Sequence, residues 1–98
     1  TNVFVVRDGR LCTPALSTGC LAGITRELVL ELVDCDEVTD LTLDHLRHAP
    51  EAFLTSSTRD VHPVAGVDGR AFPAPVPGPL TVAAMEAFAD LQARTLDP

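Results

Sequence analysis

The sequence predicts a mixed α/β or α+β unit. Two apolar runs within residues 3–13 are joined by Asp8-Gly9, a pair typical of a two-residue hairpin turn. The first run lacks polar alternation, which predicts a strand buried on both faces. Residues 24–33, and the segment from Pro79 onward, carry apolar side chains at helical spacing. A chain of 98 residues holds at most one domain, so these elements should share one core.

Composition and charge exclude several classes of function. The formal net charge is −7 and no basic cluster is present, so nucleic acid is not expected as a partner. No apolar run approaches the length of a membrane span and nothing resembles a signal peptide, so we expect a cytoplasmic protein without membrane contact. The three cysteines lack a C-x-x-C spacing and should be reduced thiols. All seven basic residues are arginines, so no lysine amine is present to form a Schiff base.

The apolar content points to a partner. Hydrophobic residues make up 46% of the chain, which is rich for a small free-standing domain. We expect part of this surface to face another protein, another domain or another subunit. The chain has no initiator methionine and runs directly into an apolar strand, so we also expect it to be a piece of a longer polypeptide.

The start of the first predicted helix is the main candidate site. Residues 17–20 should form a loop, and the helix should begin around Gly23-Ile24-Thr25. Backbone N–H groups at a helix start have no intrahelical acceptor and carry the positive end of the helix dipole. A glycine there admits a ligand close to the backbone, and Thr25 adds a hydroxyl. This stretch is a candidate cup for a phosphate or carboxylate, although many helices begin this way without a ligand.

Local patterns predict the elements that follow the cup. The helix over 24–33 should bury the stripe Ile24, Leu28 and Leu32, with Val29 and Val33 beside it. Residues 34–37, Asp-Cys-Asp-Glu, are predicted to be a solvated acidic loop, because they lack the glycine and final glutamate of a calcium-binding loop.

A short helix is predicted over residues 43–48, with Thr42 as its cap. His45 and His48 lie three apart on this helix, a spacing that zinc sites use. No third ligand is evident, so we expect surface histidines and no metal site.

Two strands are predicted over 52–55 and 61–67, the second broken by Pro63. The loop over 56–60 is dense in hydroxyls and forms a second candidate anion surface, although the same residue types also favour ordinary turns. After a proline-rich connection, a final helix should begin at Gly78-Pro79. It should bury the stripe Leu80, Ala84, Phe88 and Leu91.

A serine hydrolase built from Ser56 or Ser57, Asp60 and His62 is a weaker interpretation. The G-x-S-x-G elbow is absent, and three partners this close in sequence seldom converge in space. The phosphate cup has more support, because two separate loops offer donors to an anion.

Five motifs in order resemble one known family. They are Gly-Ile-Thr-Arg at 23–26, Phe-Leu-Thr-Ser-Ser-Thr at 53–58, Pro-Val at 63–64, Asp-Gly-Arg at 68–70 and Gly-Pro-Leu-Thr at 78–81. Their order and spacing resemble the C-terminal half of the class IV (fold-type IV) enzymes that use pyridoxal 5′-phosphate (PLP). That family includes branched-chain and D-amino acid aminotransferases and aminodeoxychorismate lyases. The resemblance covers nearly all of residues 1–98 and implies a C-terminal, phosphate-binding domain: a mixed sheet or pseudo-barrel with flanking helices.

The resemblance implies that the helix start binds PLP. The backbone N–H groups of Ile24 and Thr25, with the Thr25 hydroxyl, would bind the phosphate, and Gly23 belongs to the same site. Leu21 would pack on one face of the pyridine ring. Physical chemistry agrees with these roles, because a dianion requires convergent donors and a flat ring requires an apolar face.

The resemblance also gives roles to the hydroxyl-rich turn. Ser56 and Ser57 would bind the cofactor. Ser57 stands where the family often has threonine, and its hydroxyl and N–H would reach the phosphate. The amide of Thr58 would lie near the substrate carboxylate. No residue of this chain is expected to be catalytic.

The chain departs from the family in several respects. The family's Schiff-base lysine lies in the preceding half, and the glutamate that pairs with the pyridine nitrogen lies before the point that matches Thr1. The segment Val33–Leu41 is a few residues shorter than usual, so it should lose part of the strand between two helices. Pro50 stands where the family usually has an acidic residue.

These observations together predict a fragment of a PLP-dependent class IV aminotransferase or 4-amino-4-deoxychorismate lyase. The implied partners are the N-terminal half of the same enzyme, a second copy in a homodimer, and an amino acid or aminodeoxychorismate as substrate. The chain alone should be catalytically inert and should bind PLP weakly. The alternative is a non-catalytic module that binds a phosphorylated small molecule or serves in assembly.

Overall fold

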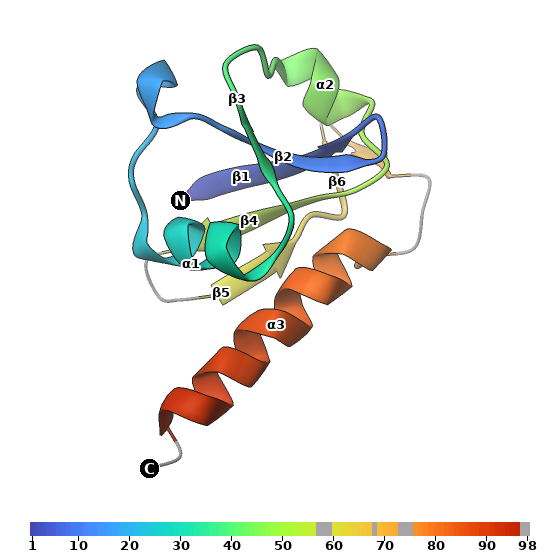
Figure 1. Ribbon diagram of the computed structural model, residues 1–98. Helices are drawn as coiled ribbons and strands as arrows, with labels where there is room; N and C mark the ends of the chain where they lie inside the picture. Colours follow the sequence, from blue (N-terminus) through green and yellow to red (C-terminus); the bar gives the residue numbers. More distant parts are fainter. Residues whose placement is uncertain (57–59, 68, 73–75, 97–98) are drawn as a thin grey trace.

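The computed structural model describes residues 1–56, 60–67, 69–72 and 76–96, and Figure 1 shows their arrangement. The strands are β1 (Asn2–Arg7), β2 (Arg10–Pro14), β3 (Asp36–Val38), β4 (Ala52–Ser56), β5 (Asp60–Pro63), β6 (Gly66–Val67) and β7 (Arg70–Ala71). The helices are α1 (Ile24–Leu32), α2 (Leu43–Arg47) and α3 (Pro79–Leu96), and a short 3-10 helix (Leu16–Thr18) precedes α1. Within the described ranges, no helix is long and apolar enough to cross a membrane.

Five strands form one mixed sheet in the order β3-β2-β1-β4-β5. β1 pairs antiparallel with both β2 and β4, β4 pairs antiparallel with β5, and β3 runs parallel to β2. β6 and β7 form a separate two-stranded sheet. The predicted class, a mixed sheet with flanking helices, is confirmed.

The central strand β1 is covered on both faces, as its unbroken apolar run predicts. One face packs against α1 and α3 through the cluster Phe4, Val6, Leu11, Val29, Phe53 and Ala84. The opposite face carries the cluster Val5, Ala49, Ala52 and Phe72, against which side chains of α2 and β6 pack. Phe4 and Phe53 stack across neighbouring strands, with ring centroids 4.8 Å apart.

Turns and caps follow their local signals. Asp8 and Gly9 both have positive φ, 53° and 79°, as a two-residue hairpin requires. The Thr42 hydroxyl accepts a hydrogen bond from the His45 N–H, and the Thr42 N–H donates to His45 Nδ1, so His45 completes the cap of α2. In the part of the chain that the structure describes, no three potential ligands are grouped so as to hold a metal ion. α3 begins at Pro79, as predicted.

The predicted acidic loop is partly a strand. Asp36–Val38 form β3, in which Cys12 of β2 pairs with Asp36. Arg10 donates hydrogen bonds to Asp34 and Asp36, and Arg26 donates one to Glu37. The prediction of a loop was therefore wrong for residues 36 and 37. The arginines that hold these carboxylates lie more than ten residues earlier, where a local pattern does not reveal them.

The buried face of α1 also differs from the predicted stripe. Ile24 is 64% exposed, and Leu28 and Leu32 are only half-buried. Thr25, Arg26 and Val29 are the buried residues of this helix. The predicted neighbours Val29 and Val33 do contact the core. The stripe through Ile24 was wrong because hydrophobicity alone places an arginine outside, whereas Arg26 is buried with carboxylate partners.

We expect Asp36→Asn to weaken the pH dependence of stability in acid. Hydrogen bonds from Arg10 lower the pKa of Asp36 below its ordinary value of 3.8. A carboxyl group with a lowered pKa stabilises the fold above its unfolded-state pKa, and this contribution is lost as the pH falls through the folded-state pKa. The variant should therefore be slightly less stable than wild type at neutral pH, and this small gap should narrow as the pH falls below about 3.8 and vanish below the folded-state pKa.

Urea unfolding at a series of pH values measures this gap. Glu31→Gln, at an exposed position of α1, is the control that removes a carboxylate away from Arg10. A gap between Asp36→Asn and wild type that stays constant from neutral pH to the acid limit would contradict the prediction.

Candidate anion site at the start of helix α1

The first turn of α1 presents free backbone donors. Gly23 is the N-cap, with an extended backbone (φ −66°, ψ 142°) and no side-chain cap. The first helical hydrogen bond runs from the Glu27 N–H to the Gly23 carbonyl, at 3.1 Å. Among the described residues, the N–H groups of Ile24, Thr25 and Arg26 have no acceptor. We call the N–H groups of Ile24 and Thr25, together with the neighbouring backbone of Ser56, the anion cup.

A hydrogen bond joins the two segments that the sequence identifies as candidate anion surfaces. The Thr25 hydroxyl donates to the carbonyl of Ser56, the last residue of β4, at 2.7 Å. Thr25 is 1% exposed, so this bond is shielded from water. A threonine hydroxyl has one proton. The predicted bond from this hydroxyl to a phosphate would therefore require the proton to leave Ser56, and it stays a prediction.

A side chain at position 23 would collide with a neighbouring residue, Asn2. A Cβ atom placed on Gly23 would lie 2.5 Å from Asn2 Oδ1. The same Asn2 side chain donates from Nδ2 to the Leu21 carbonyl at 2.7 Å, and Asn2 is 7% exposed. From the sequence alone, a glycine at this position is expected to admit a ligand close to the backbone. The structure gives it a second reason, the contact with Asn2.

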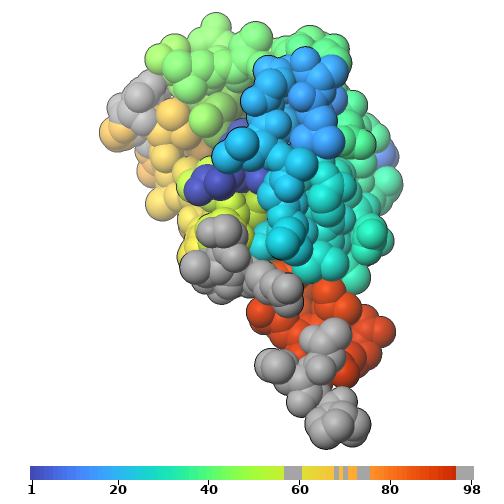
Figure 2. All heavy atoms as spheres, turned by 90° about the vertical axis from the view of Figure 1, so that its left-hand side faces the viewer, coloured from blue at the N-terminus to red at the C-terminus, as the bar shows by residue number. Residues whose placement is uncertain are grey.

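The approach to the cup is apolar. Leu21 is 72% exposed and Ile24 is 64% exposed, and Leu16 on the same connection is 46% exposed. Figure 2 shows the cyan segment that leads into α1 beside the dark-blue start of the chain. These apolar side chains are exposed, and their contact with another protein, domain or subunit stays a prediction. Ser57 and Thr58, the other predicted site residues, lie outside the described residues.

Two buried polar residues near the cup were not singled out from the sequence. Asn2 pairs with Thr55 across β1 and β4, so their side chains lie on the same face of the sheet. Thr55 is 1% exposed, and its hydroxyl has no hydrogen-bond partner within the described ranges. The signal that could have found them is a polar residue inside an otherwise apolar strand.

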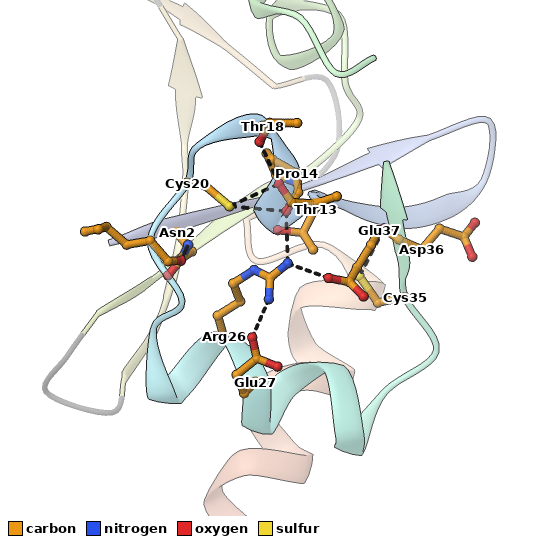
Figure 3. Close-up of polar contacts among 12 residues, drawn as sticks. Asn2, Thr13, Pro14, Thr18, Cys20, Arg26, Glu27, Cys35, Asp36 and Glu37 are labelled. Carbon is orange, nitrogen blue, oxygen red and sulfur yellow. Dashed lines mark hydrogen bonds and ion pairs between the residues drawn. The ribbon is translucent and has the colours of Figure 1, made fainter. Parts of the chain in front are cut away.

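Arg26 fixes the helix behind the cup. Figure 3 shows its guanidinium between Pro14, Glu27 and Glu37. It donates to the Pro14 carbonyl at 3.0 Å and to Glu37 Oε1 at 2.7 Å, and its side chain is 0% exposed. Burial lowers the pKa of Arg26, but the hydrogen bond to Glu37 and the charge of Glu27 outweigh this, so the pKa is raised and the group stays charged. Because two carboxylates accompany one cation, this cluster holds α1 in place without adding positive charge to the cup.

Other candidate chemistries gain no support. Burial raises the pKa of Cys12 and raises that of Cys35 to about 12, so neither thiol offers a thiolate nucleophile at neutral pH. All three cysteines are free thiols, as expected. Of the residues in the hydrolase interpretation, Ser57 and the side chain of Asp60 are outside the described part of the structure, so that interpretation stays untested.

Comparison with known proteins identifies the family. The profile of the class IV amino-transferases matches residues 1–67. The chain is 39% identical over 85 residues to the D-alanine aminotransferase of Bacillus licheniformis, covering 83% of this chain and 30% of that protein. It is 37% identical over 94 residues to a branched-chain-amino-acid aminotransferase of Pseudomonas aeruginosa, covering 92% and 30%.

Solved structures agree with this match. The branched-chain amino acid aminotransferase of Escherichia coli superimposes with a TM-score of 0.82 at 33% identity, covering 92% of this chain and 32% of that one. An aminotransferase of Brucella abortus, bound to the cofactor PLP, gives a TM-score of 0.80 at 33% identity, covering 93% and 33%. The chain spans about a third of the length of the relatives that it matches. By sequence and by fold, this chain belongs to the class IV aminotransferase family.

Proposed function

We propose that this chain supplies the phosphate-binding part of a PLP-dependent class IV aminotransferase. The observation that carries the proposal is the anion cup: the N–H groups of Ile24 and Thr25 lack acceptors within the described residues, and the Thr25–Ser56 bond holds them beside the end of β4. A helix start with free N–H groups favours a doubly charged phosphate through hydrogen bonds and through the helix dipole.

The residues present fit both parts of the cofactor. In this proposal Ile24 and Thr25 hold the phosphate through their N–H groups, while Gly23 and Ser56 shape the cup around it. Leu21, at 72% exposure beside the cup, offers an apolar surface to the pyridine ring. The predicted contributions of Ser57 to the phosphate and of Thr58 to the substrate carboxylate complete the proposed site.

The chemistry of the cofactor requires a residue that this chain lacks. Bound PLP would act as an electron sink for the amino-acid substrate. The chain contains no lysine, so the amine that holds the cofactor covalently would come from another segment. We propose the N-terminal half of the same enzyme as that segment, seated on the exposed Leu16, Leu21 and Ile24.

The finer assignments rest on the relatives. Relatives named as aminotransferases favour amino-group transfer over the lyase reaction, with an amino acid as substrate. A homodimer and a cytoplasmic location belong to the same proposal. The free N–H groups of the cup would serve equally in a second candidate, a non-catalytic module that binds a phosphorylated small molecule.

We expect pyridoxamine 5′-phosphate to bind this chain at the first turn of α1. This amine is a cleaner probe than PLP, whose aldehyde reacts with the Thr1 amine and with thiols. In a spectrum of the ¹⁵N-labelled chain, the N–H signals of Ile24 and Thr25 should shift with saturation. Pyridoxamine, which lacks the phosphate, is the matched control and should shift them far less. Equal effects of the two ligands, or shifts confined to other parts of the chain, would refute the proposed cup.

A further inference from the structure

We propose that Asn2 is a positioning residue for the anion cup, an inference that rests on the proposed function. Asn2 lies 21 positions before Gly23 and starts β1, so nothing in the local sequence connects it with the helix. Its two side-chain ends nevertheless contact the two residues that lead into α1, Leu21 and Gly23. It acts through these backbone contacts.

The amide end of Asn2 fixes the backbone before the cup. Nδ2 donates to the Leu21 carbonyl at 2.7 Å, and Asn2 is 7% exposed. Each peptide unit is planar, so a fixed carbonyl fixes the N–H of the following residue. The N–H of Ile24 belongs to the second peptide unit after this held carbonyl. The bond therefore anchors the short segment that leads to the first free N–H of α1 and restricts its movement.

The oxygen end of Asn2 replaces a helix cap without closing the site. Helices commonly begin with Ser, Thr, Asp or Asn, whose side-chain oxygen accepts a hydrogen bond from the second or third N–H group. Here the N-cap is Gly23, which has no Cβ. A Cβ added to Gly23 would lie 2.5 Å from Asn2 Oδ1. In the described part of the chain, no side chain accepts from the first N–H groups of α1. Asn2 thus takes the space of a capping side chain and leaves the donors for a ligand.

The Asn2 side chain is uncharged, which also leaves the N–H donors of α1 free for a ligand. A carboxylate of the same shape would be attracted to the free N–H groups and the positive end of the helix, and it would repel a phosphate. It would also lose the donor that holds the Leu21 carbonyl. The structure therefore calls for an amide at this position, where an acid would convert the ligand site into an ordinary capped helix.

The test compares Asn2→Asp and Asn2→Ala with wild type in titrations with pyridoxamine 5′-phosphate and with pyridoxamine. Asn2→Asp should weaken binding of the phosphate ligand by roughly tenfold or more, and Asn2→Ala by a smaller factor, with little change for pyridoxamine. The control is Thr81→Val, which removes a buried hydrogen bond to Glu51 at the opposite end of β4. It should lower the melting temperature without changing the preference for the phosphate ligand.

A second arm tests the contact with Gly23 by thermal unfolding alone. Gly23→Ala should destabilise wild type, because the new Cβ meets Asn2 Oδ1. The same substitution should cost much less in the Asn2→Ala background, where that oxygen is absent. Equal costs in the two backgrounds would show that the contact does not constrain the helix start, and would overturn the inference.

The two proposals fail in distinguishable ways. If wild type prefers the phosphate ligand and folded Asn2→Asp keeps that preference, Asn2 is not a positioning residue and the proposed function stands. If wild type does not distinguish the two ligands, the proposed function fails and this inference fails with it.

Discussion

Arg26→Met is expected to lower the free energy of unfolding by about 3 kcal/mol, which corresponds to a loss of roughly 15 °C in melting temperature for a chain of this size. The guanidinium is 0% exposed and joins three parts of the fold, α1, the end of β2 and β3. Methionine keeps most of the side-chain stem and removes every donor. Glu27 and Glu37, each about half exposed, can be hydrated in the variant, so the expected cost lies at the lower end for a broken buried pair.

Arg10→Met is the matched control for this prediction. Arg10 also binds two carboxylates, Asp34 and Asp36, but its side chain is 51% exposed. An exposed ion pair contributes little to stability, so this variant should lower the unfolding free energy at neutral pH by far less than Arg26→Met. Equilibrium urea unfolding of both variants gives the comparison. Equal losses in the two variants would show that burial of Arg26 does not set its contribution.

The difference between buried Arg26 and exposed Arg10 also explains which features of α1 could be predicted from the sequence. Hydrophobic periodicity predicted a helix over 24–33, and α1 spans Ile24–Leu32. Hydrophobic periodicity did not predict which face of α1 is buried. A scale of side-chain hydrophobicity assigns Arg10 and Arg26 the same value, although only Arg26 is buried. Arg10 lies outside and Arg26 inside because of partners that fold back from later in the chain, Glu37 above all.

Signals that act over a few residues were reliable guides to the fold. Asp8-Gly9 predicted a hairpin, Thr42 predicted a helix cap, and Pro79 predicted a helix start. The contacts that shape the candidate site join residues far apart in sequence. Asn2 reaches Leu21, and Thr25 reaches Ser56, 31 positions away. Single-chain patterns identify such residues only through a family resemblance, which gave Thr25 and Ser56 a role in the site and gave none to Asn2.

Glu51→Gln is expected to loosen the start of α3 and to lower the free energy of unfolding by about 2 kcal/mol. Glu51 is 6% exposed and its carboxylate accepts three hydrogen bonds at the start of this helix. The donors are the N–H groups of Leu80 and Thr81, at 3.2 and 2.7 Å, and the Thr81 hydroxyl at 2.7 Å. Glutamine preserves the shape and one oxygen but removes the negative charge that favours a helix N-terminus. One carboxylate oxygen, an acceptor, is thereby replaced by an NH₂ group, a donor that faces the N–H groups at the start of α3.

Hydrogen exchange separates a local effect on α3 from a general loss of stability. Exchange at the N–H groups of Leu80 and Thr81 should accelerate in Glu51→Gln by more than exchange at Phe53 in β4, because the lost contacts hold only the helix start. Gly78→Ala should act in the same direction, since its Cβ would lie 2.6 Å from the Glu51 carboxyl carbon. Glu86→Gln, at an exposed position of the same helix, should change neither quantity. Uniform acceleration across the sheet and α3 would show instead that Glu51 stabilises the whole fold and has no particular role in docking this helix.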